Sequence, residues 1–246
     1  YLLFSRRSWM FYPEVWWGKM RAAYYLASVP EFLLADAEKI LGQLTLAHGF
    51  TLEQLQRDAW ATQIEVLNAD LYGIDCGHIL FEFVIPRMGK RADVVLVFEE
   101  LVFVLEYKAG TNAFDRAAID QVHDYALDLK NFHKGSHDTP IVPIVVATGA
   151  EGASQQDLCW AVDGVAQPLL VGSAGVRPII DRCLEGGFTK SISFEEWLAA
   201  GYQPTPTIVE AAQALYQSHD VVEIARSDAG AKCLTSAPLG QTEGFS

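Results

Sequence analysis

Two consecutive apolar segments, separated by a pair of glutamates, constrain the fold of this chain most. Val94–Phe98 and Val102–Leu105 contain only apolar residues, and Glu99 and Glu100 lie between them. Strands that are apolar on both faces are typical of the centre of a sheet that is covered on both sides. A hairpin of two such strands therefore predicts a central sheet with helices packed on each face.

The remaining segments predict the helices that cover this sheet. Helices are expected where apolar residues recur at a helical period, and strands where the apolar runs are short. The expected helices start at Ser28 and Thr51, cover Asp115–Phe132 and Arg177–Leu184, start again at Ser193 and end with Ile208–His219. The strands expected around the hairpin are His78–Pro86, Ile141–Ala147 and Pro168–Gly172. This order predicts an α/β fold with a mixed central β-sheet flanked by helices.

Composition places the chain among globular proteins. Hydrophobic residues make up 50% of its 246 residues, which is enough for a core and excludes intrinsic disorder as the dominant state. The longest uncharged apolar runs fall far short of the roughly 18 residues that a membrane span needs. The four cysteines form no Cys/His cluster, so we expect reduced thiols, no zinc site and a cytoplasmic location.

Charged side chains gather at one end of the predicted hairpin. Residues two apart in a strand point to the same face, so Glu106 and Lys108 project together from the end of an apolar strand. If the two strands pair around Glu99 and Glu100, Asp93 lies at the same edge of the sheet. Two carboxylates and an amine are costly to place together unless they bind something.

The chemistry of these side chains favours a cation site. Paired carboxylates suit Mg²⁺ or Mn²⁺, which takes a few protein oxygens and keeps several waters. A lysine beside such a site can orient or deprotonate an attacking water and offset charge in the transition state of phosphodiester hydrolysis. The alternative interpretation is a surface ion pair that caps the hairpin.

At these residues the sequence resembles the PD-(D/E)XK nuclease superfamily. Asp93 matches the aspartate of the motif, and Glu106-Tyr107-Lys108 matches (D/E)XK. On the next helix, Gln121 and Tyr125 match the QxxxY element of the branch that includes RecB and lambda exonuclease. The family's helix glutamate would fall on Glu65, although Glu53 and Glu82 are alternatives. Glu82 lies on a strand between two phenylalanines that face the other way, so it can also approach the metal.

This resemblance implies a fold, a reaction and a role for each residue. The implied fold is restriction-endonuclease-like over residues 1–200, with residues 1–50 as a helical N-terminal extension. The implied activity is metal-dependent cleavage of DNA, with Mg²⁺ or Mn²⁺ as cofactor. The implied roles are metal binding for Glu65, Asp93 and Glu106, positioning of water for Lys108, and support of the lysine or the strand end by Gln121 and Tyr125.

A narrower resemblance covers nearly the whole chain. The segments around Trp60, Ile85-Pro-Arg, Lys90-Arg-Ala-Asp and Pro204–Tyr216 are similar to the N-terminal region of Schlafen-group-3-like helicases. In those proteins this region precedes a P-loop ATPase, and antiviral defence is the setting that the resemblance suggests. We therefore expect residues 201–246, which begin with the proline-containing linker Gly201–Thr207, to lead to a helicase domain outside this chain.

The overall charge opposes nucleic-acid binding, whereas the local charge favours it. Taken alone, the net charge of −13 argues against a protein that wraps nucleic acid by global electrostatics. Basic residues nevertheless cluster around the predicted site, and they are candidates for phosphate contacts: Arg87, Lys90, Arg91, Lys108 and Arg116, with Lys130, His133 and Lys134 further along. DNA is the expected partner, and RNA is an alternative. The rival hypothesis is a module of the same fold that binds nucleic acid or docks the motor without cutting.

Overall fold

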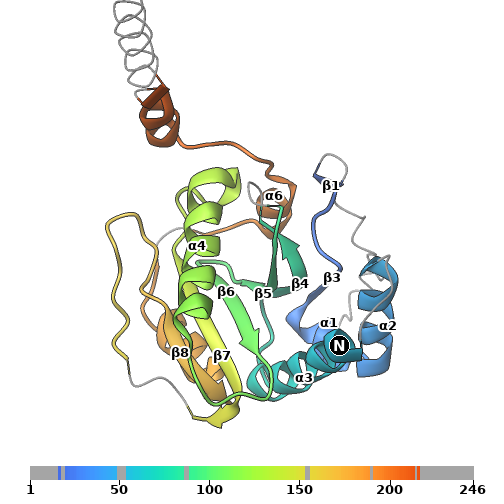
Figure 1. Cartoon of the computed structure of the whole chain (residues 1–246). Coiled ribbons are helices and arrows are strands. Elements are labelled where there is room, and N and C mark those ends of the chain that lie inside the picture. Colours follow the sequence, from blue (N-terminus) through green and yellow to red (C-terminus); the bar gives the residue numbers. More distant parts are fainter. Residues whose placement is uncertain are drawn as a thin grey trace, which may run out of the picture. The chain divides into compact units, whose positions relative to one another are not determined.

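The computed structural model describes residues 16–17, 20–48, 54–85, 89–152, 156–188, 191–213 and 215–216. The chain divides into two units, Tyr1–Gln203 and Pro204–Ser246. Within the second unit, residues 206–213 are helical. The first unit contains the sheet and the predicted site (Figure 1).

The first unit is built on a mixed six-stranded sheet with the order β3-β4-β5-β6-β7-β8. The strands are β3 (Tyr25–Ser28), β4 (His78–Val84), β5 (Arg91–Val97), β6 (Val102–Lys108), β7 (Ile141–Glu151) and β8 (Leu169–Ser173). From β3 to β6 neighbouring strands are antiparallel, and β7 and β8 continue parallel to β6. β1 (Trp16–Trp17) and β2 (Met20–Arg21) form a separate antiparallel pair. The mixed α/β architecture is confirmed, and β3 is a strand that the sequence did not predict.

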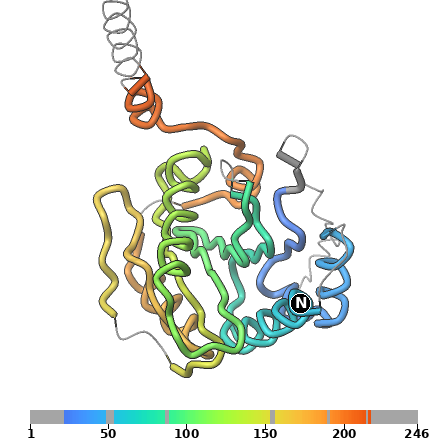
Figure 2. The backbone as a smooth tube through the Cα atoms, viewed as in Figure 1, coloured from blue at the N-terminus to red at the C-terminus, as the bar shows by residue number. Residues whose placement is uncertain are grey.

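Helices cover both faces of this sheet (Figures 1 and 2). One face packs against residues of α1 (Val29–Leu34), α2 (Ala37–His48), α3 (Gln54–Asp70) and α5 (Val176–Leu184). The other face packs against α4 (Arg116–Phe132) and α6 (Phe194–Ala199). The two apolar faces of the predicted hairpin are thus both buried.

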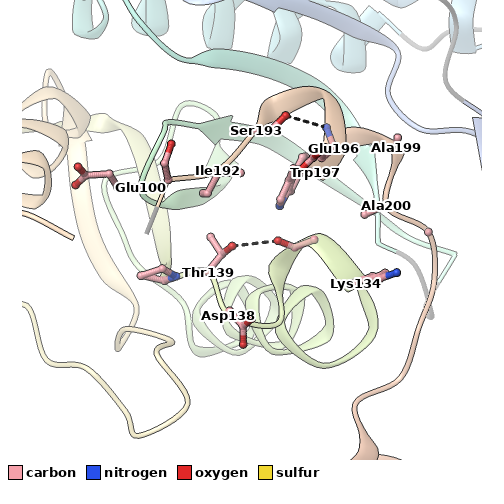
Figure 3. A pocket seen from close by; sticks show the side chains of 14 residues that line it. Glu100, Lys134, Asp138, Thr139, Ile192, Ser193, Glu196, Trp197, Ala199 and Ala200 are labelled. Carbon is pink, nitrogen blue, oxygen red and sulfur yellow. Dashed lines mark hydrogen bonds between the residues drawn. The ribbon is translucent and has the colours of Figure 1, made fainter. Parts of the chain in front are cut away.

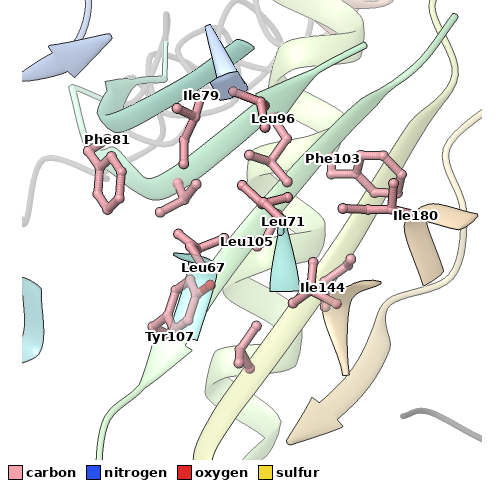
Figure 4. Packing of buried hydrophobic residues seen from close by; sticks show 14 of the residues in the cluster. Leu67, Leu71, Ile79, Phe81, Leu96, Phe103, Leu105, Tyr107, Ile144 and Ile180 are labelled. Carbon is pink, nitrogen blue, oxygen red and sulfur yellow. The ribbon is translucent and has the colours of Figure 1, made fainter. Parts of the chain in front are cut away.

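β6 shows how this burial orients the predicted site. Phe103, Leu105 and Tyr107 point to the face covered by α3 and α5, as Figure 4 shows. The alternating residues Val102 and Val104 pack on the face covered by α4. Because side chains alternate along a strand, Glu106 and Lys108 belong to the α4 face.

The helix expected to start at Ser28 is two helices. Ser28 caps α1 as predicted, since its side chain accepts the Glu31 N–H and the Glu31 carboxylate accepts the Ser28 N–H. Ala35 then adopts an extended conformation and ends α1. Asp36 follows, and its carboxylate accepts the Glu38 N–H at 2.8 Å. The Asp36 side chain thus accepts an N–H of the first turn of α2, and only two residues separate α2 from α1.

A pair of glycine substitutions tests the packing of the β7–β8 edge. A Cβ on Gly172 in β8 would overlap the backbone of Ala150 in β7, where the register between the two strands shifts. We expect Gly172→Ala to lower the free energy of unfolding by about 1–3 kcal/mol, the usual cost of overpacking. Gly42→Ala on the exposed side of α2 has no atom within 4 Å and should raise it by about 0.5–1 kcal/mol. Urea denaturation of both variants measures this, and equal stability of the two would contradict the packing described.

Candidate active site

Three acidic residues lie next to one another across neighbouring strands. Where β4 and β5 pair, Phe81 is opposite Val94 and Phe83 is opposite Ala92, so Glu82 falls at the level of Asp93. Where β5 and β6 pair, Val94 is opposite Leu105, so Asp93 and Glu106 follow at the next position. The sequence predicted the second of these pairs from the hairpin, and the structure confirms that β5 and β6 are adjacent.

Asp93 is fixed by the neighbouring strand. Its Oδ2 accepts the backbone N–H of Tyr107 at 2.7 Å, so the residue between Glu106 and Lys108 holds the aspartate through its main chain. Burial raises the pKa of Asp93 well above its ordinary value, and the adjacent Glu106 carboxylate raises it further. The position therefore disfavours a lone negative charge.

Glu106 is only 4% exposed and is half satisfied. Its Oε1 accepts bonds from Lys108 Nζ at 3.0 Å and from Gln121 Nε2 at 2.9 Å. Its Oε2 is buried and has no hydrogen-bond partner among the residues that the structure describes. Burial raises the pKa of Glu106, against the opposing effect of the Lys108 ammonium. An unpartnered buried carboxylate oxygen is costly and indicates that the site can accept a further ligand.

The first half of α4 supports Glu106. Asp115 caps the helix by accepting the Ala118 N–H at 2.7 Å, which sets the position of the first turns. Gln121 and Tyr125, one turn apart, are joined by a 3.0 Å bond between Gln121 Nε2 and Tyr125 Oη. Burial raises the pKa of Tyr125 to about 12, and the charge of Glu106 contributes. The predicted pair thus lies at the site, but Gln121 binds the glutamate and not the lysine.

Glu65 is not brought to this site. It lies on the exposed side of α3, whose buried residues include Ile64 and Leu67, because the apolar stripe of the helix turns it away from the sheet. Glu82 is the glutamate beside Asp93, whereas Glu53 lies outside the described residues. A sequence signal for Glu82 exists, since it is the only charged residue in β4.

Glu82 is held by the opposite layer of the molecule. Its Oε1 accepts the indole N–H of Trp60 at 2.8 Å and the side-chain amide of Gln56 at 3.4 Å. Both donors come from the first turns of α3. In the sequence, Trp60 stands out only within a segment that resembles the helicase family, because a pattern of residues does not reveal which group the indole N–H will meet.

The predicted phosphate-binding residues differ in their surroundings. Lys90 is exposed, and Arg87 lies outside the described residues. The guanidinium of Arg91 lies 4.1 Å from the centre of the Tyr24 ring and donates to the main-chain carbonyl of Glu82, so it has structural contacts. Of the predicted set, Lys90 is thus the one whose side chain lies in solvent next to β5.

Arg116 and Lys108 are the remaining basic residues near the site. Arg116 is exposed at the start of α4, where it pairs with Asp120 at 2.9 Å. Such an exposed pair is weak and can exchange for a phosphate. The Lys108 side chain is 28% exposed, so it contacts Glu106 and solvent together.

The predicted series of basic residues for phosphate contacts does not continue along α4. Lys130 is buried, and its ammonium donates to the Thr139 carbonyl at 2.9 Å. His133 is fully buried, with its ring nitrogens 2.8 Å from Ser136 Oγ and 2.9 Å from the Ala200 carbonyl. Burial lowers the pKa of His133 to about 4, which leaves the ring neutral near neutral pH. Neither side chain is available for a phosphate contact, because Lys130 is buried against the Thr139 carbonyl and His133 against the Ala200 carbonyl.

The carboxylates fit a small cation that retains most of its water. In the part of the chain that the structure describes, no three His, Cys, Asp or Glu side chains form a group placed to bind one metal ion. Asp93 and Glu106 nevertheless form an adjacent pair with raised pKa values, and Glu106 Oε2 lacks a partner. Mg²⁺ and Mn²⁺ bind through one or two carboxylates and keep several waters, so this pair suffices as a donor set.

A separate cavity of about 620 Å³ lies away from these carboxylates. Its lining includes Glu100, which precedes β6, Lys134, which follows α4, and Glu196 and Trp197 of α6 (Figure 3). Because Glu100 lies before the start of β6 and Glu106 lies near its end, the cavity and the acidic site are at opposite ends of the sheet.

Comparison with known proteins yielded no relative. No family model matches the chain, and neither the curated proteins nor the solved structures contain a match. Among the described residues, no helix combines the length and apolar character required to cross a membrane. Function is therefore inferred from the geometry and charges of the acidic site.

The raised pKa of Asp93 predicts a stability that depends on pH. A carboxyl whose folded-state pKa is raised binds its proton more tightly in the folded protein than in the unfolded chain. The free energy of unfolding therefore falls as pH rises through the window between the ordinary and the raised pKa. The window begins at about pH 4, the ordinary aspartate pKa, and ends above the raised pKa. Asn is neutral throughout and retains an oxygen for the Tyr107 N–H. We therefore expect Asp93→Asn to raise the melting temperature of the metal-free protein at pH 7.

Melting temperatures in EDTA between pH 4.5 and 8 measure this effect. The gain from Asp93→Asn should shrink as pH falls, since the wild-type carboxyl then becomes protonated. Asp124→Asn, on the exposed side of α4, is the matched control and should leave the melting temperature nearly unchanged. A destabilised Asp93→Asn at pH 7 would contradict the assigned environment.

Proposed function

We propose that this chain is a metal-dependent nuclease module that hydrolyses phosphodiester bonds, with DNA as the substrate. The observation that carries the proposal is the adjacent pair Asp93 and Glu106, with Lys108 bonded to Glu106 and one oxygen of Glu106 unpartnered. A structural ion pair would explain Lys108 and Glu106 but not the second, partly buried carboxylate of Asp93 beside them.

Each side chain has a role in this proposal. Asp93 and Glu106 would hold Mg²⁺ or Mn²⁺, which when bound polarises the phosphodiester and lowers the pKa of the attacking water. Lys108, already in contact with Glu106 and with solvent, would orient that water and offset negative charge in the transition state. Gln121 fixes the Glu106 carboxylate, and Tyr125 fixes Gln121.

The substrate would bind across the open edge of the sheet. Lys90 and Arg116 are exposed and near this edge, so they are the candidates for phosphate contacts. With a net charge of −13, so few contacts predict weak binding by this chain alone. We propose that a helicase domain following the chain supplies further affinity by raising the effective concentration of DNA at the site. Antiviral defence is the biological setting that we propose for the whole protein.

Substitution of the lysine separates metal binding from chemistry. Lys108→Ala should retain Mn²⁺ binding and lose on the order of 100-fold or more in the rate of DNA cleavage, the usual effect of one positioned catalytic group. Glu106→Ala should lose both, because it removes a cation ligand. Cleavage of end-labelled DNA with Mn²⁺ and calorimetric titration with Mn²⁺ measure the two properties.

The matched control is Lys39→Ala, which removes an exposed lysine from α2 and should cleave as the wild type does. Normal cleavage by Lys108→Ala would show that the lysine has no catalytic role. If the wild type binds DNA but cuts neither DNA nor RNA with any divalent metal, the chain is a non-catalytic binding module.

A further inference from the structure

Glu82 has a backbone conformation that a strand residue rarely adopts. Its φ is +53°. Among the described residues other than glycine, Ala174 is the only further one with a positive φ. The left-handed region is unfavourable for residues with a Cβ, and such strain is typical of functional sites when the surroundings enforce it. Glu82 lies within β4 and not in a turn.

This conformation reverses the facing of β4. Phe81 packs on the α3 face of the sheet, whereas Phe83 packs on the α4 face. The Phe83 ring stacks on the Trp197 ring with 5.3 Å between the ring centres. In a regular strand, residues two apart would share a face. The reversal at Glu82 places both aromatic rings in the core and leaves the glutamate at the level of Asp93.

Neighbouring side chains hold Glu82 in place. The fully buried Trp60 donates its indole N–H to the carboxylate at 2.8 Å, and Gln56 donates at 3.4 Å. Arg91 donates to the main-chain carbonyl of Glu82 and is itself stacked on Tyr24. Both the side chain and the backbone of this strained residue are therefore fixed by contacts.

The placement adds a third negative charge beside two that already repel each other. Glu82 lies at the level of Asp93, between the Phe81–Val94 and Phe83–Ala92 pairs of β4 and β5. Burial raises the pKa of Glu82 itself, against the effects of the Trp60 bond and of Arg91. A strained and desolvated carboxylate at this point opposes folding unless a cation is bound nearby.

We propose that Glu82 is a third carboxylate of the cation site, acting on the water shell of the cation, and that Trp60 is the residue that positions it. This inference depends on the proposed metal-dependent function. It accounts for the absence of a three-residue ligand group among the described residues, because a hydrated Mg²⁺ or Mn²⁺ can be held by outer carboxylates through its waters.

Mn²⁺ affinity of isosteric variants tests the role of Glu82. Glu82→Gln keeps an oxygen for the Trp60 indole and removes only the charge, and we expect Mn²⁺ binding to weaken by about 10- to 100-fold, as for other outer-shell groups. Glu65→Gln tests the competing helix glutamate, and Glu185→Gln, exposed at the end of α5, is the matched control. Electron paramagnetic resonance of free Mn²⁺ gives the affinities, and thermal melts confirm that the variants fold.

A second measurement observes Trp60 directly. In ¹⁵N-labelled protein, Mg²⁺ should shift the indole N–H resonance of Trp60, because the cation changes the charge on the oxygen that accepts this bond. The resonance is assigned from its loss in Trp60→Phe, and the shift should vanish in Glu82→Gln. A role of Trp60 confined to packing would give no Mg²⁺-dependent shift.

The outcomes separate this inference from the proposed function. The inference is supported if Glu82→Gln is the only one of the three glutamate variants that binds Mn²⁺ weakly, and if Mg²⁺ shifts the Trp60 indole resonance of the wild type. Normal binding by Glu82→Gln, or loss of binding in Glu65→Gln instead, overturns it and leaves the Asp93–Glu106 site intact. A wild-type protein that binds no Mn²⁺ overturns both.

Discussion

Repulsion between two adjacent carboxylates on β5 and β6 is the constraint on which the rest of this site depends. Asp93 and Glu106 lie one position beyond the Val94–Leu105 pair of these strands, and burial together with the charge of Glu106 raises the pKa of Asp93. The contacts around them offset the cost of ionisation only in part. The Tyr107 N–H binds Asp93, and Lys108 and Gln121 both bind the same oxygen of Glu106. Among the described residues, none donates to the other oxygen.

Local spacing was sufficient to predict the centre of the molecule. Two apolar strands with a short turn can pair in few ways, so Asp93, Glu106 and Lys108 had to meet at one edge. The helix that follows carries Gln121 and Tyr125 on one side because they are one turn apart. These features are set by residues close in sequence, and the structure reproduces the proximity of all five, although their roles stay predictions.

Contacts between distant segments decided what the sequence could not predict. Glu65 and Glu82 are both near the predicted site in sequence, but the rotation of α3 against the sheet turns Glu65 to solvent. The carboxylate of Glu82, a residue with a left-handed backbone, is held by Trp60, 22 positions earlier. His133 is buried because Ala200, 67 positions later, packs over the end of α4. A periodic pattern within one segment contains no information about such partners.

The position of the acidic site relative to the cavity bears on the kind of substrate. The cavity of about 620 Å³ is at the opposite end of β6, and its lining does not include the carboxylates of the site. A small metabolite is usually enclosed by a pocket that removes most of its surface from water. A polymer does not need such enclosure, because contacts along its backbone on both sides of the reacting bond share the binding energy. The acidic pair lies at the end of the central strands β5 and β6, and the exposed Lys90 and Arg116 lie on the segments that lead into β5 and α4. For the proposed nuclease we therefore favour an extended phosphodiester over a small molecule as substrate.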